Sequence, residues 1–330
     1  MKTTPILMKL GVFLGLSVAF LLVSPGTVWP QESVSRFPSR PITIIIPLAP
    51  GSGTDICVRL IAKEAEKYFG QPIVAVNKPG AALTIGTAAV ASAKPDGYTI
   101  GFCGGPPLFF TPLLEKVPYD PLKDLRMVMQ YGAYNFGVIV KSDSPYKTFK
   151  DLIEFARQNP RKMTYGTVGT NSMPNIALER IAKQEKAQIT HIPFKGLAEG
   201  QTALLGGHIV AWAGDFNYSL IESGETRVVM LLKEERSAEY PEVPILKNLG
   251  YDIPYPMFVG FFTARAVPDA IVKKLDEGFS KAMKEPGFIK GMKELRFPVM
   301  YRSGKDLDAY VVQNHQFFSK LLRELGLIKE

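Results

Sequence analysis

A run of β-branched residues at 42–46, Ile-Thr-Ile-Ile-Ile, restricts the fold of this chain more than any other feature. An uninterrupted apolar run of this kind is typical of a strand that is buried on both faces of a sheet. A turn-rich loop follows it, and then an amphipathic stretch at 54–69, which ends at Gly70 and predicts a helix. A buried strand that leads into a helix indicates a βαβ unit and a parallel sheet.

The same alternation of strand and helix recurs along the chain in two series. Strands are predicted at 42–46, 73–76, 98–103, 136–140, 163–167, 189–192, 208–212, 227–232 and 258–263. Helices are predicted at 54–69, 84–93, 148–158, 175–186, 198–205, 268–284, 288–295 and 305–325. We therefore predict an α/β protein with two mostly parallel sheets.

The restart of the alternation after Asn135 predicts two domains, and their lengths indicate that the C-terminal helices return to the first one. Lobe 1 is then 31–135 plus 258–330, lobe 2 is 136–257, and strands near 136–140 and 258–263 make the crossings. A hinge of two crossover strands suits closure around a ligand. The alternative is two consecutive domains with one linker, but the chain has no Ser/Gly-rich linker.

Residues 1–30 have the pattern of a secretory signal peptide. Lys2 and Lys9 precede an uncharged apolar run at 10–23, and small or helix-breaking residues follow at 24–27. The run is shorter than the roughly 20 residues that span a bilayer, which disfavours the alternative of an uncleaved anchor. We therefore expect cleavage of this segment and export of the mature chain.

The charge and the cysteine content exclude several function classes. Loss of Lys2 and Lys9 takes the formal net charge from +8 to +6, and the remaining basic residues form no run, so no nucleic-acid partner is expected. Two cysteines are too few for a disulfide-dense scaffold or a Cys-rich metal ribbon. The sequence contains no H-E-x-x-H, C-x-x-C or EF-hand motif, and we expect neither a metal nor a cofactor.

The loop at 50–55, Pro-Gly-Ser-Gly-Thr-Asp, follows the first buried strand and opens a helix. Glycines let a ligand approach the backbone, and the first N–H groups of a helix are free donors at its positive end, so the loop suits an anion. It is not a dinucleotide fingerprint, because position 56 is Ile instead of Gly, and it has no Walker Gly-Lys-Ser/Thr. The alternative is a plain N-cap formed by Thr54 or Asp55.

A second loop of the same design lies at 165–172, Tyr-Gly-Thr-Val-Gly-Thr-Asn-Ser, before a helix with Pro174 near its start. Thr167, Thr170, Asn171 and Ser172 supply hydroxyl and amide groups. Ligands of α/β proteins bind outside the carboxyl ends of the strands. Two such loops, one in each lobe, are therefore expected to grip an anion across a cleft.

Cys103 lies in Gly-Phe-Cys-Gly-Gly at 101–105, which has the spacing of a nucleophile elbow. An exported hydrolase is therefore an alternative function. Against it, no histidine has an evident acidic partner, and Pro106 and Pro107 stand where the elbow helix should begin. Cys103 is also expected at the same sheet edge as Cys57. Two alternatives remain for this pair: a disulfide bond between them, or two buried free thiols.

Seven short motifs occur in order between about Phe37 and the C-terminus. They are Pro41-Ile-Thr-Ile-Ile-Ile-Pro-Leu-Ala-Pro-Gly-Ser-Gly-Thr-Asp55, Asn77-Lys-Pro-Gly-Ala81 with Thr84-Ile-Gly86, Lys94-Pro-Asp-Gly-Tyr98, Tyr119-Asp-Pro-Leu-Lys-Asp124, Tyr165-Gly-Thr-Val-Gly169, Ile192-Pro-Phe-Lys-Gly196 and Leu204-Leu-Gly-Gly207. Each motif is weak alone. Together they resemble the substrate-binding proteins of tripartite tricarboxylate transport, the TctC or Bug family.

The resemblance implies a two-lobed, type II-like periplasmic binding protein of Venus-flytrap shape, which is monomeric and performs no catalysis. It implies a small organic mono- or dicarboxylate as the ligand and the membrane subunits of a tripartite tricarboxylate-type transporter as partners. The ligand-binding residues that the resemblance implies, called the gripping residues below, are Ser52, Gly53, Thr54 and Asp55 in lobe 1 and Thr167, Thr170, Asn171 and Ser172 in lobe 2. Asp55 would organise its loop and position water, because a bare carboxylate repels an anion.

Five positions depart from the family pattern: Asn171 replaces Gly, Asn175 replaces His, Ala82 and Leu83 replace Gly-Gly, and Phe194 replaces Tyr. These changes concern the far end of the ligand and favour a partly apolar or aromatic carboxylate. The residues expected at that end are Pro106, Phe109, Tyr134, Asp215 and Phe258. Two further functions stay open, a sensory receptor that acts with a signalling partner and a binder of polyanions through net charge.

Overall fold

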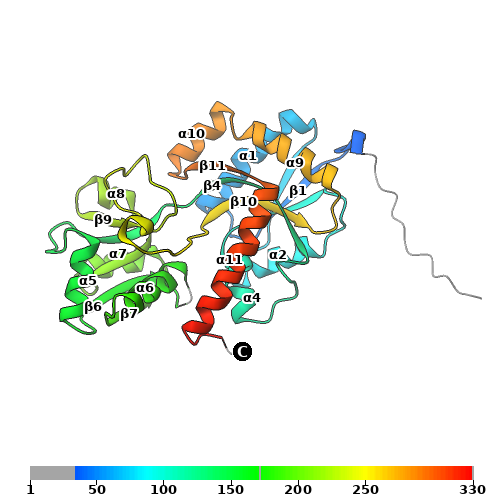
Figure 1. Cartoon of the computed structure of the whole chain (residues 1–330). Coiled ribbons are helices and arrows are strands. Elements are labelled where there is room, and N and C mark those ends of the chain that lie inside the picture. The colour runs from blue at the N-terminus through cyan, green and yellow to red at the C-terminus, as the bar shows by residue number, and fades with distance from the viewer. Residues whose placement is uncertain (1–33, 171, 329–330) are drawn as a thin grey trace, which may run out of the picture.

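The structure, a computed structural model, describes residues 34–170 and 172–328. The expected signal peptide, residues 1–30, and the expected ligand residue Asn171 lie outside the described residues. Among the helices of the described ranges, none is both long and apolar enough to cross a membrane. Figure 1 shows two lobes side by side, and each is built around one sheet.

The larger lobe contains a six-stranded sheet with the order β11-β4-β10-β3-β1-β2. Its strands are β1 (Ile42–Ile46), β2 (Ile73–Asn77), β3 (Thr99–Cys103), β4 (Leu125–Ala133), β10 (Phe258–Ala264) and β11 (Val299–Ser303). β1 pairs in parallel with β2 and β3, as the βαβ pattern predicts. β10 is antiparallel to β3 and β4, and β11 is antiparallel to β4.

The smaller lobe contains a five-stranded sheet with the order β7-β6-β8-β5-β9. Its strands are β5 (Phe136–Lys141), β6 (Met163–Val168), β7 (Ile189–Phe194), β8 (Ala211–Asp215) and β9 (Thr226–Leu231). β6 is parallel to β7 and β8, whereas β5 is antiparallel to β8 and β9. The predicted two-lobed α/β fold is confirmed, but both sheets are mixed, so the prediction of mostly parallel sheets is wrong.

The mixed strand directions follow from the way the chain enters each lobe. β10 enters the larger lobe from the smaller one and begins beside the end of β3, where Gly260 pairs with Cys103. β5 enters the smaller lobe and begins beside the end of β8, where Phe136 pairs with Asp215. A strand that begins where its neighbour ends is antiparallel to it. Each crossing therefore introduces antiparallel pairing at the edge between the lobes.

The chain passes between the sheets twice, at 134–135 between β4 and β5 and at 232–257 between β9 and β10. We propose that the lobes have the predicted limits, 31–135 plus 258–330 for lobe 1 and 136–257 for lobe 2. All strands of the six-stranded sheet fall within the first set of residues, and all strands of the five-stranded sheet fall within the second. The second crossing is a long irregular segment with one 3-10 helix, Leu246–Leu249, rather than a hinge strand.

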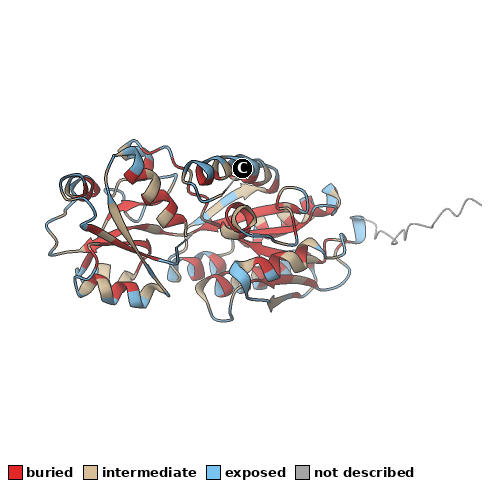
Figure 2. Cartoon of the chain, turned by 90° about the horizontal axis from the view of Figure 1, so that it is seen from below, coloured by how far each residue is buried: buried red, intermediate tan, exposed pale blue. Residues whose placement is uncertain are grey.

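Helices cover both faces of the larger sheet. α1 (Gly53–Phe69) packs with α9 (Asp269–Ala282) and α10 (Pro286–Glu294), and their apolar residues share a core with Ile44 and Phe102. α2 (Thr84–Ala91), α3 (Pro106–Phe109) and α11 (Gly304–Glu324) share the core of the opposite face with Ile45 and Phe262. The smaller lobe contains α5 (Phe149–Gln158), α6 (Met173–Gln184), α7 (Leu197–Leu205) and α8 (Tyr218–Glu222). Figure 2 shows buried residues in the strands and on the inner sides of these helices.

Three features of the chain differ from the sequence prediction. β4 and β11 are not predicted, because polar residues such as Arg126 and Gln130 interrupt the apolar pattern of β4, although Gln130 is 2% exposed. The strand predicted at 208–212 lies at Ala211–Asp215. Pro106 and Pro107 open the short helix α3 instead of preventing it, since the first turn of a helix does not need their missing N–H groups.

Cys57 and Cys103 are free, buried thiols in the structure, so it does not contain the disulfide that was one of the two options. Cys57 belongs to the core beneath α9 and α10, whereas Cys103 belongs to the core on the α11 side. Successive residues of a strand point to opposite faces, and Phe102 rather than Cys103 points toward α1. The two thiols therefore lie on opposite faces of the larger sheet.

Candidate functional site

The loop between β1 and α1 presents the start of a helix. Gly51 has a φ of +80°, which turns the backbone where a side chain would be strained. Ser52 is the N-cap of α1, and its hydroxyl accepts a hydrogen bond from the Asp55 N–H at 3.2 Å. The N–H groups of Gly53 and Thr54 lie in the first turn, where a helix offers them no acceptor. They are therefore free to donate to a ligand at the positive end of α1.

The buried carboxylate of Asp55 stabilises this loop through hydrogen bonds. Its carboxylate accepts hydrogen bonds from the Gly51 N–H at 2.9 Å, from Asn77 Nδ2 at 2.8 Å and from Arg59 Nε at 3.1 Å. Asn77 Nδ2 also donates to the Leu48 carbonyl at 3.0 Å. Burial by itself raises the pKa of Asp55, but the hydrogen bonds from Arg59, Asn77 and Gly51 outweigh it and hold the pKa below its ordinary value. Asp55 therefore stays ionised and faces its own loop.

The loop between β6 and α6 is held by a chain of side-chain contacts. The Thr167 hydroxyl donates to the Gly169 carbonyl at 2.8 Å, lies 2.8 Å from His191 Nε2 and accepts from the Ser172 hydroxyl at 3.0 Å. Thr167 is fully buried, and burial lowers the pKa of His191. These contacts fix Thr167, Gly169 and Ser172 relative to one another, and Ser172 is the N-cap of α6.

A cavity of about 480 Å³ lies between the two lobes, and we name it the cleft cavity. Its residues come from the ends of strands and the starts of helices in both lobes and from both crossings. They are Leu48, Ser52, Thr54, Leu83, Phe102, Gly104, Gly105, Pro106 and Phe110 from lobe 1, Phe136, Val168, Ser172, Met173, Pro174, Ala213, Gly214 and Asp215 from lobe 2, and Tyr134 and Met257 from the crossings.

Helix N-termini supply the positive potential of the cleft cavity. The N-cap residues of α1 and α6, which are Ser52 and Ser172, line it. Leu83 also lines it, but the 3-10 helix Ala81–Leu83 runs into α2 there and the Thr84 N–H already donates to the Ala81 carbonyl. No Lys, Arg or His is present among the described residues of its lining. A helix N-terminus carries roughly half a positive charge together with free N–H donors, and this combination binds carboxylates and other anions. The cavity can therefore hold an anion without forming a salt bridge.

The expected gripping residues of lobe 1 divide into two groups. Ser52 and Thr54 line the cleft cavity, whereas Gly53 and Asp55 are absent from its lining. A Cβ added at Gly53 would lie 3.3 Å from the ring of Phe297, so this glycine is adapted to close packing at the start of α1. Lobe 1 therefore offers hydroxyl groups to the cavity, and Asp55 organises the loop as expected.

Among the expected residues of lobe 2, Ser172 lines the cleft cavity. Thr167 lies beneath the loop and is engaged in its hydrogen bonds, so its hydroxyl does not reach the cavity. Thr170 is exposed, and its carbonyl accepts a hydrogen bond from the Asn175 side chain. The structure thus brings together three of the expected hydroxyl groups, those of Ser52, Thr54 and Ser172.

Of the residues expected at the far end of the ligand, some line the cleft cavity and others lie in the core. Pro106, Tyr134 and Asp215 line the cleft cavity. Phe109 and Phe258 instead pack against each other in the core, with ring centroids 6.4 Å apart and exposures of 0% and 2%. Phe258 and Phe262 share the α11 side of β10, whereas Val259 and Phe261 lie on the opposite face, because side chains alternate along a strand.

Sequence reasoning missed most of the apolar lining. These side chains carry no chemical signal, because Leu, Phe, Val and Met have the same patterns in a core and in a ligand site. They are Leu48, Leu83, Phe102, Phe110, Phe136, Val168, Met173 and Met257.

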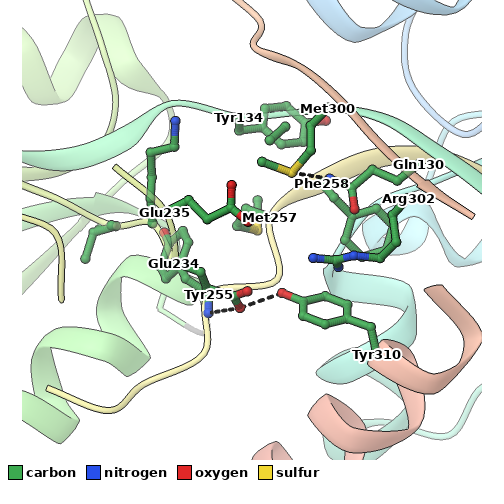
Figure 3. A pocket seen from close by; sticks show the side chains of 13 residues that line it. Gln130, Tyr134, Glu234, Glu235, Tyr255, Met257, Phe258, Met300, Arg302 and Tyr310 are labelled. Atoms are coloured by element: carbon green, nitrogen blue, oxygen red, sulfur yellow. Dashed lines mark hydrogen bonds between the residues drawn. The ribbon is translucent and has the colours of Figure 1, made fainter. Parts of the chain in front are cut away.

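Behind the cleft cavity lies a much smaller one of about 40 Å³, the hinge pocket, which suits water rather than an organic ligand. It shares Tyr134 and Met257 with the cleft cavity. Figure 3 shows Tyr310 and the backbone of Tyr255 turned toward Glu234. The Glu234 carboxylate accepts from the Tyr255 N–H at 3.0 Å and from the Tyr310 hydroxyl at 2.5 Å. The second crossing is thereby joined to α11.

Cys103 does not have the surroundings of a catalytic nucleophile. It is 1% exposed and is not part of the cleft cavity lining. Burial raises the pKa of its thiol well above the ordinary value, which disfavours the reactive thiolate.

Fold and site together define a two-lobed solute-binding protein. The model of the tripartite tricarboxylate transporter family receptor, TctC, matches residues 57–327, and the chain belongs to this family. A UPF0065 protein from the gbd 5′ region of Cupriavidus necator is 33% identical over 316 residues, which cover 96% of this chain and 96% of the relative. The predicted family resemblance is thus confirmed.

Solved structures agree with this assignment. A TctC solute-binding protein from Polaromonas, without ligand, has a TM-score of 0.80 at 26% identity and covers 87% of this chain and 99% of its own. The R. palustris protein Rpa4515 with adipate has a TM-score of 0.71 at 25% identity and covers 88% of this chain and 98% of its own. The family is one of periplasmic solute-binding receptors.

Proposed function

We propose that this protein is a periplasmic receptor that binds a small organic carboxylate and delivers it to the membrane subunits of a tripartite tricarboxylate-type transporter. One observation carries the proposal. The N-termini of α1 and α6 and the hydroxyl groups of Ser52, Thr54 and Ser172 surround a cavity between two lobes, and its described lining contains no basic side chain. Such a site stabilises a carboxylate through N–H and O–H donors.

Binding needs contributions from both lobes. Ser52 and Thr54 approach the ligand from lobe 1, and Ser172 approaches it from lobe 2. A carboxylate that contacts both groups stabilises the arrangement in which the lobes are close, because it binds that arrangement more tightly than an open one. The receptor therefore changes shape with its ligand and performs no chemistry on it.

Three further observations support the proposal. The family is described as a transporter receptor family. One related structure holds adipate, a dicarboxylate. Residues 1–30 have the pattern of an export signal, which agrees with a periplasmic location.

A thermal-shift screen of the chain without residues 1–30 tests the carboxylate. The panel contains mono- and dicarboxylates of increasing length, and each is paired with its uncharged amide. A true ligand at about 100 times its Kd stabilises the protein by about 2.7 kcal/mol, or about 5 °C in Tm. We expect such a rise with a carboxylate and none with its amide. A panel in which no carboxylate raises Tm would refute the proposal.

Delivery to a transporter needs a separate measurement. Cells that carry the candidate membrane subunits should take up the labelled ligand only when the receptor is present. If the protein binds a carboxylate but uptake does not depend on it, the proposed carboxylate binding stands and the proposed transport role is refuted.

A further inference from the structure

The walls of the cleft cavity beyond the helix N-termini are almost entirely apolar. Phe102, Phe110, Phe136, Met173 and Met257 contribute rings and thioether chains to them. A ligand that places its carboxylate at the helix starts must therefore bring an apolar body. Asp215 is the exception, because it is the one charged side chain among the described residues of the lining.

Asp215 lies on the lobe 2 wall, at the last position of β8. Its backbone is held in place, since its carbonyl accepts a hydrogen bond from Trp212 Nε1 at 3.0 Å and the residue pairs with Phe136 in the sheet. Gly214, immediately before it, has a φ of +158°. The carboxylate therefore projects from a fixed strand end rather than from a mobile loop.

The half-buried carboxylate of Asp215 lacks partners of the kind that satisfy the buried Asp55. Asp55 accepts from three groups, whereas no other residue in the described part of the chain donates a hydrogen bond to the Asp215 carboxylate, and only its own N–H favours the charged form. Burial raises the pKa of Asp215, and no cation among residues 34–170 and 172–328 counters it. Its free lone pairs face a cavity, and a ligand can supply the missing donor.

A charged acceptor in an apolar wall discriminates strongly between ligands. A hydroxyl or amine that reaches Asp215 makes a charge-assisted hydrogen bond, which is stronger than a neutral one. A second carboxylate at the same place instead meets a like charge, and either it or Asp215 must take up a proton. A methyl group leaves the carboxylate unsatisfied.

We propose that Asp215 sets the ligand class of this receptor as a monocarboxylate with an apolar body and a hydrogen-bond donor, such as a hydroxyl, at its far end. This inference rests on the proposed function, because that function places the ligand carboxylate at the helix N-termini. The donor end contacts lobe 2 while the carboxylate contacts Ser52 and Thr54 in lobe 1. Such a ligand bridges the lobes and favours closure.

Three ligands of equal chain length test the proposal: 6-hydroxyhexanoate, adipate and hexanoate. Their Kd values are measured by titration calorimetry at about pH 8, well above the ordinary pKa of a carboxyl. We expect 6-hydroxyhexanoate to bind at least about 10-fold more tightly than either of the others. If the wild-type protein binds the three ligands with equal affinity, or binds adipate most tightly, the assignment of Asp215 is overturned before any variant is made.

The variant Asp215→Asn removes the charge and keeps the shape. We expect it to lower the affinity for 6-hydroxyhexanoate and to raise that for adipate, so that their ratio changes by about 10-fold or more. Asp143→Asn, in which an exposed carboxylate of the same lobe is neutralised, is the matched control and should leave the ratio unchanged. Asp215→Ser serves if the amide variant does not fold, and it should lose the same preference.

The two proposals fail in different ways. If no carboxylate of any kind binds, the proposed function is refuted and the assignment of Asp215 with it. If carboxylates bind but the ratio is the same in wild type and in Asp215→Asn, only the assignment of Asp215 is refuted.

Discussion

The hydroxyl oxygens of Thr54 and Tyr134 lie 2.9 Å apart, and this contact joins the first turn of α1 to the first crossing between the lobes. The ring of Tyr134 is stacked on Phe136 of β5, with centroids 5.6 Å apart and an interplanar angle of 17°. All three residues line the cleft cavity. The loop that we propose to bind the carboxylate is thus in direct contact with the segment about which the lobes would rotate.

Removal of one hydroxyl tests this coupling. In Tyr134→Phe the buried Thr54 hydroxyl loses its partner, and we expect the free energy of unfolding to fall by about 1 kcal/mol. The affinity for a carboxylate should fall several-fold, because Thr54 is less well oriented. Urea denaturation and calorimetry measure the two effects. Tyr146→Phe, at a half-buried tyrosine whose hydroxyl has no hydrogen-bond partner among the described residues, should change neither by more than about 0.5 kcal/mol. Unchanged affinity in Tyr134→Phe would show that the contact is only structural.

Two serine N-caps of the same geometry separate helix capping from ligand binding. Ser52 accepts from the Asp55 N–H at 3.2 Å, and Ser303 accepts from the Asp306 N–H at 3.2 Å at the start of α11. Ser52→Ala and Ser303→Ala should each lower the free energy of unfolding by about 1 kcal/mol. Only Ser52→Ala should weaken carboxylate binding, because Ser303 is outside the cleft cavity. Equal affinities in the two variants would contradict the proposed role of Ser52.

The stability that Asp55 provides should depend on pH. Its pKa lies below the ordinary value in the folded protein, so its contribution is present above the unfolded pKa of about 3.9 and is lost as pH falls through the folded pKa. Asp55→Asn should therefore lower the free energy of unfolding by about 2 kcal/mol at neutral pH. The difference from wild type should shrink below about pH 4. Urea denaturation at several pH values measures it, and a difference that is constant down to pH 2 would argue against the ionised carboxylate.

The cysteines should behave as two protected thiols. Cys57 and Cys103 are buried on opposite faces of the larger sheet, and burial raises the pKa of Cys57 to about 12. We expect no reaction with a thiol reagent in the native protein and reaction of both cysteines in denaturant without any reductant. Mass spectrometry counts the added groups. Thiols that appear only after reduction would instead reveal a disulfide.

The local elements of this protein are readable from the sequence because they depend on neighbouring residues. The run at 42–46 is a buried strand, and the glycine-containing loop that follows it leads to the N-cap of a helix. The loop at 165–172 has the same design, and the motifs around both loops indicate the family, which the comparisons confirm. Hydrophobic periodicity and capping act over a few residues, so the linear pattern contains them.

The lining of the cavity and the directions of the strands depend on contacts between distant parts of the chain. Phe258 and Asp215 look equally suited to a ligand site in the sequence, yet one lies in the core and the other in the cleft cavity. The difference arises because Phe258 lies on the face of β10 that packs against α3 and α11, whereas Asp215 is the last residue of β8, at the edge between the lobes. Cys57 and Cys103 likewise lie apart, because α1 covers one face of the larger sheet and Cys103 points to the other. The residues thus supply the donors and the apolar surface, but only the tertiary structure sets which of them meet, because strand order and the face that each side chain joins depend on contacts between distant segments.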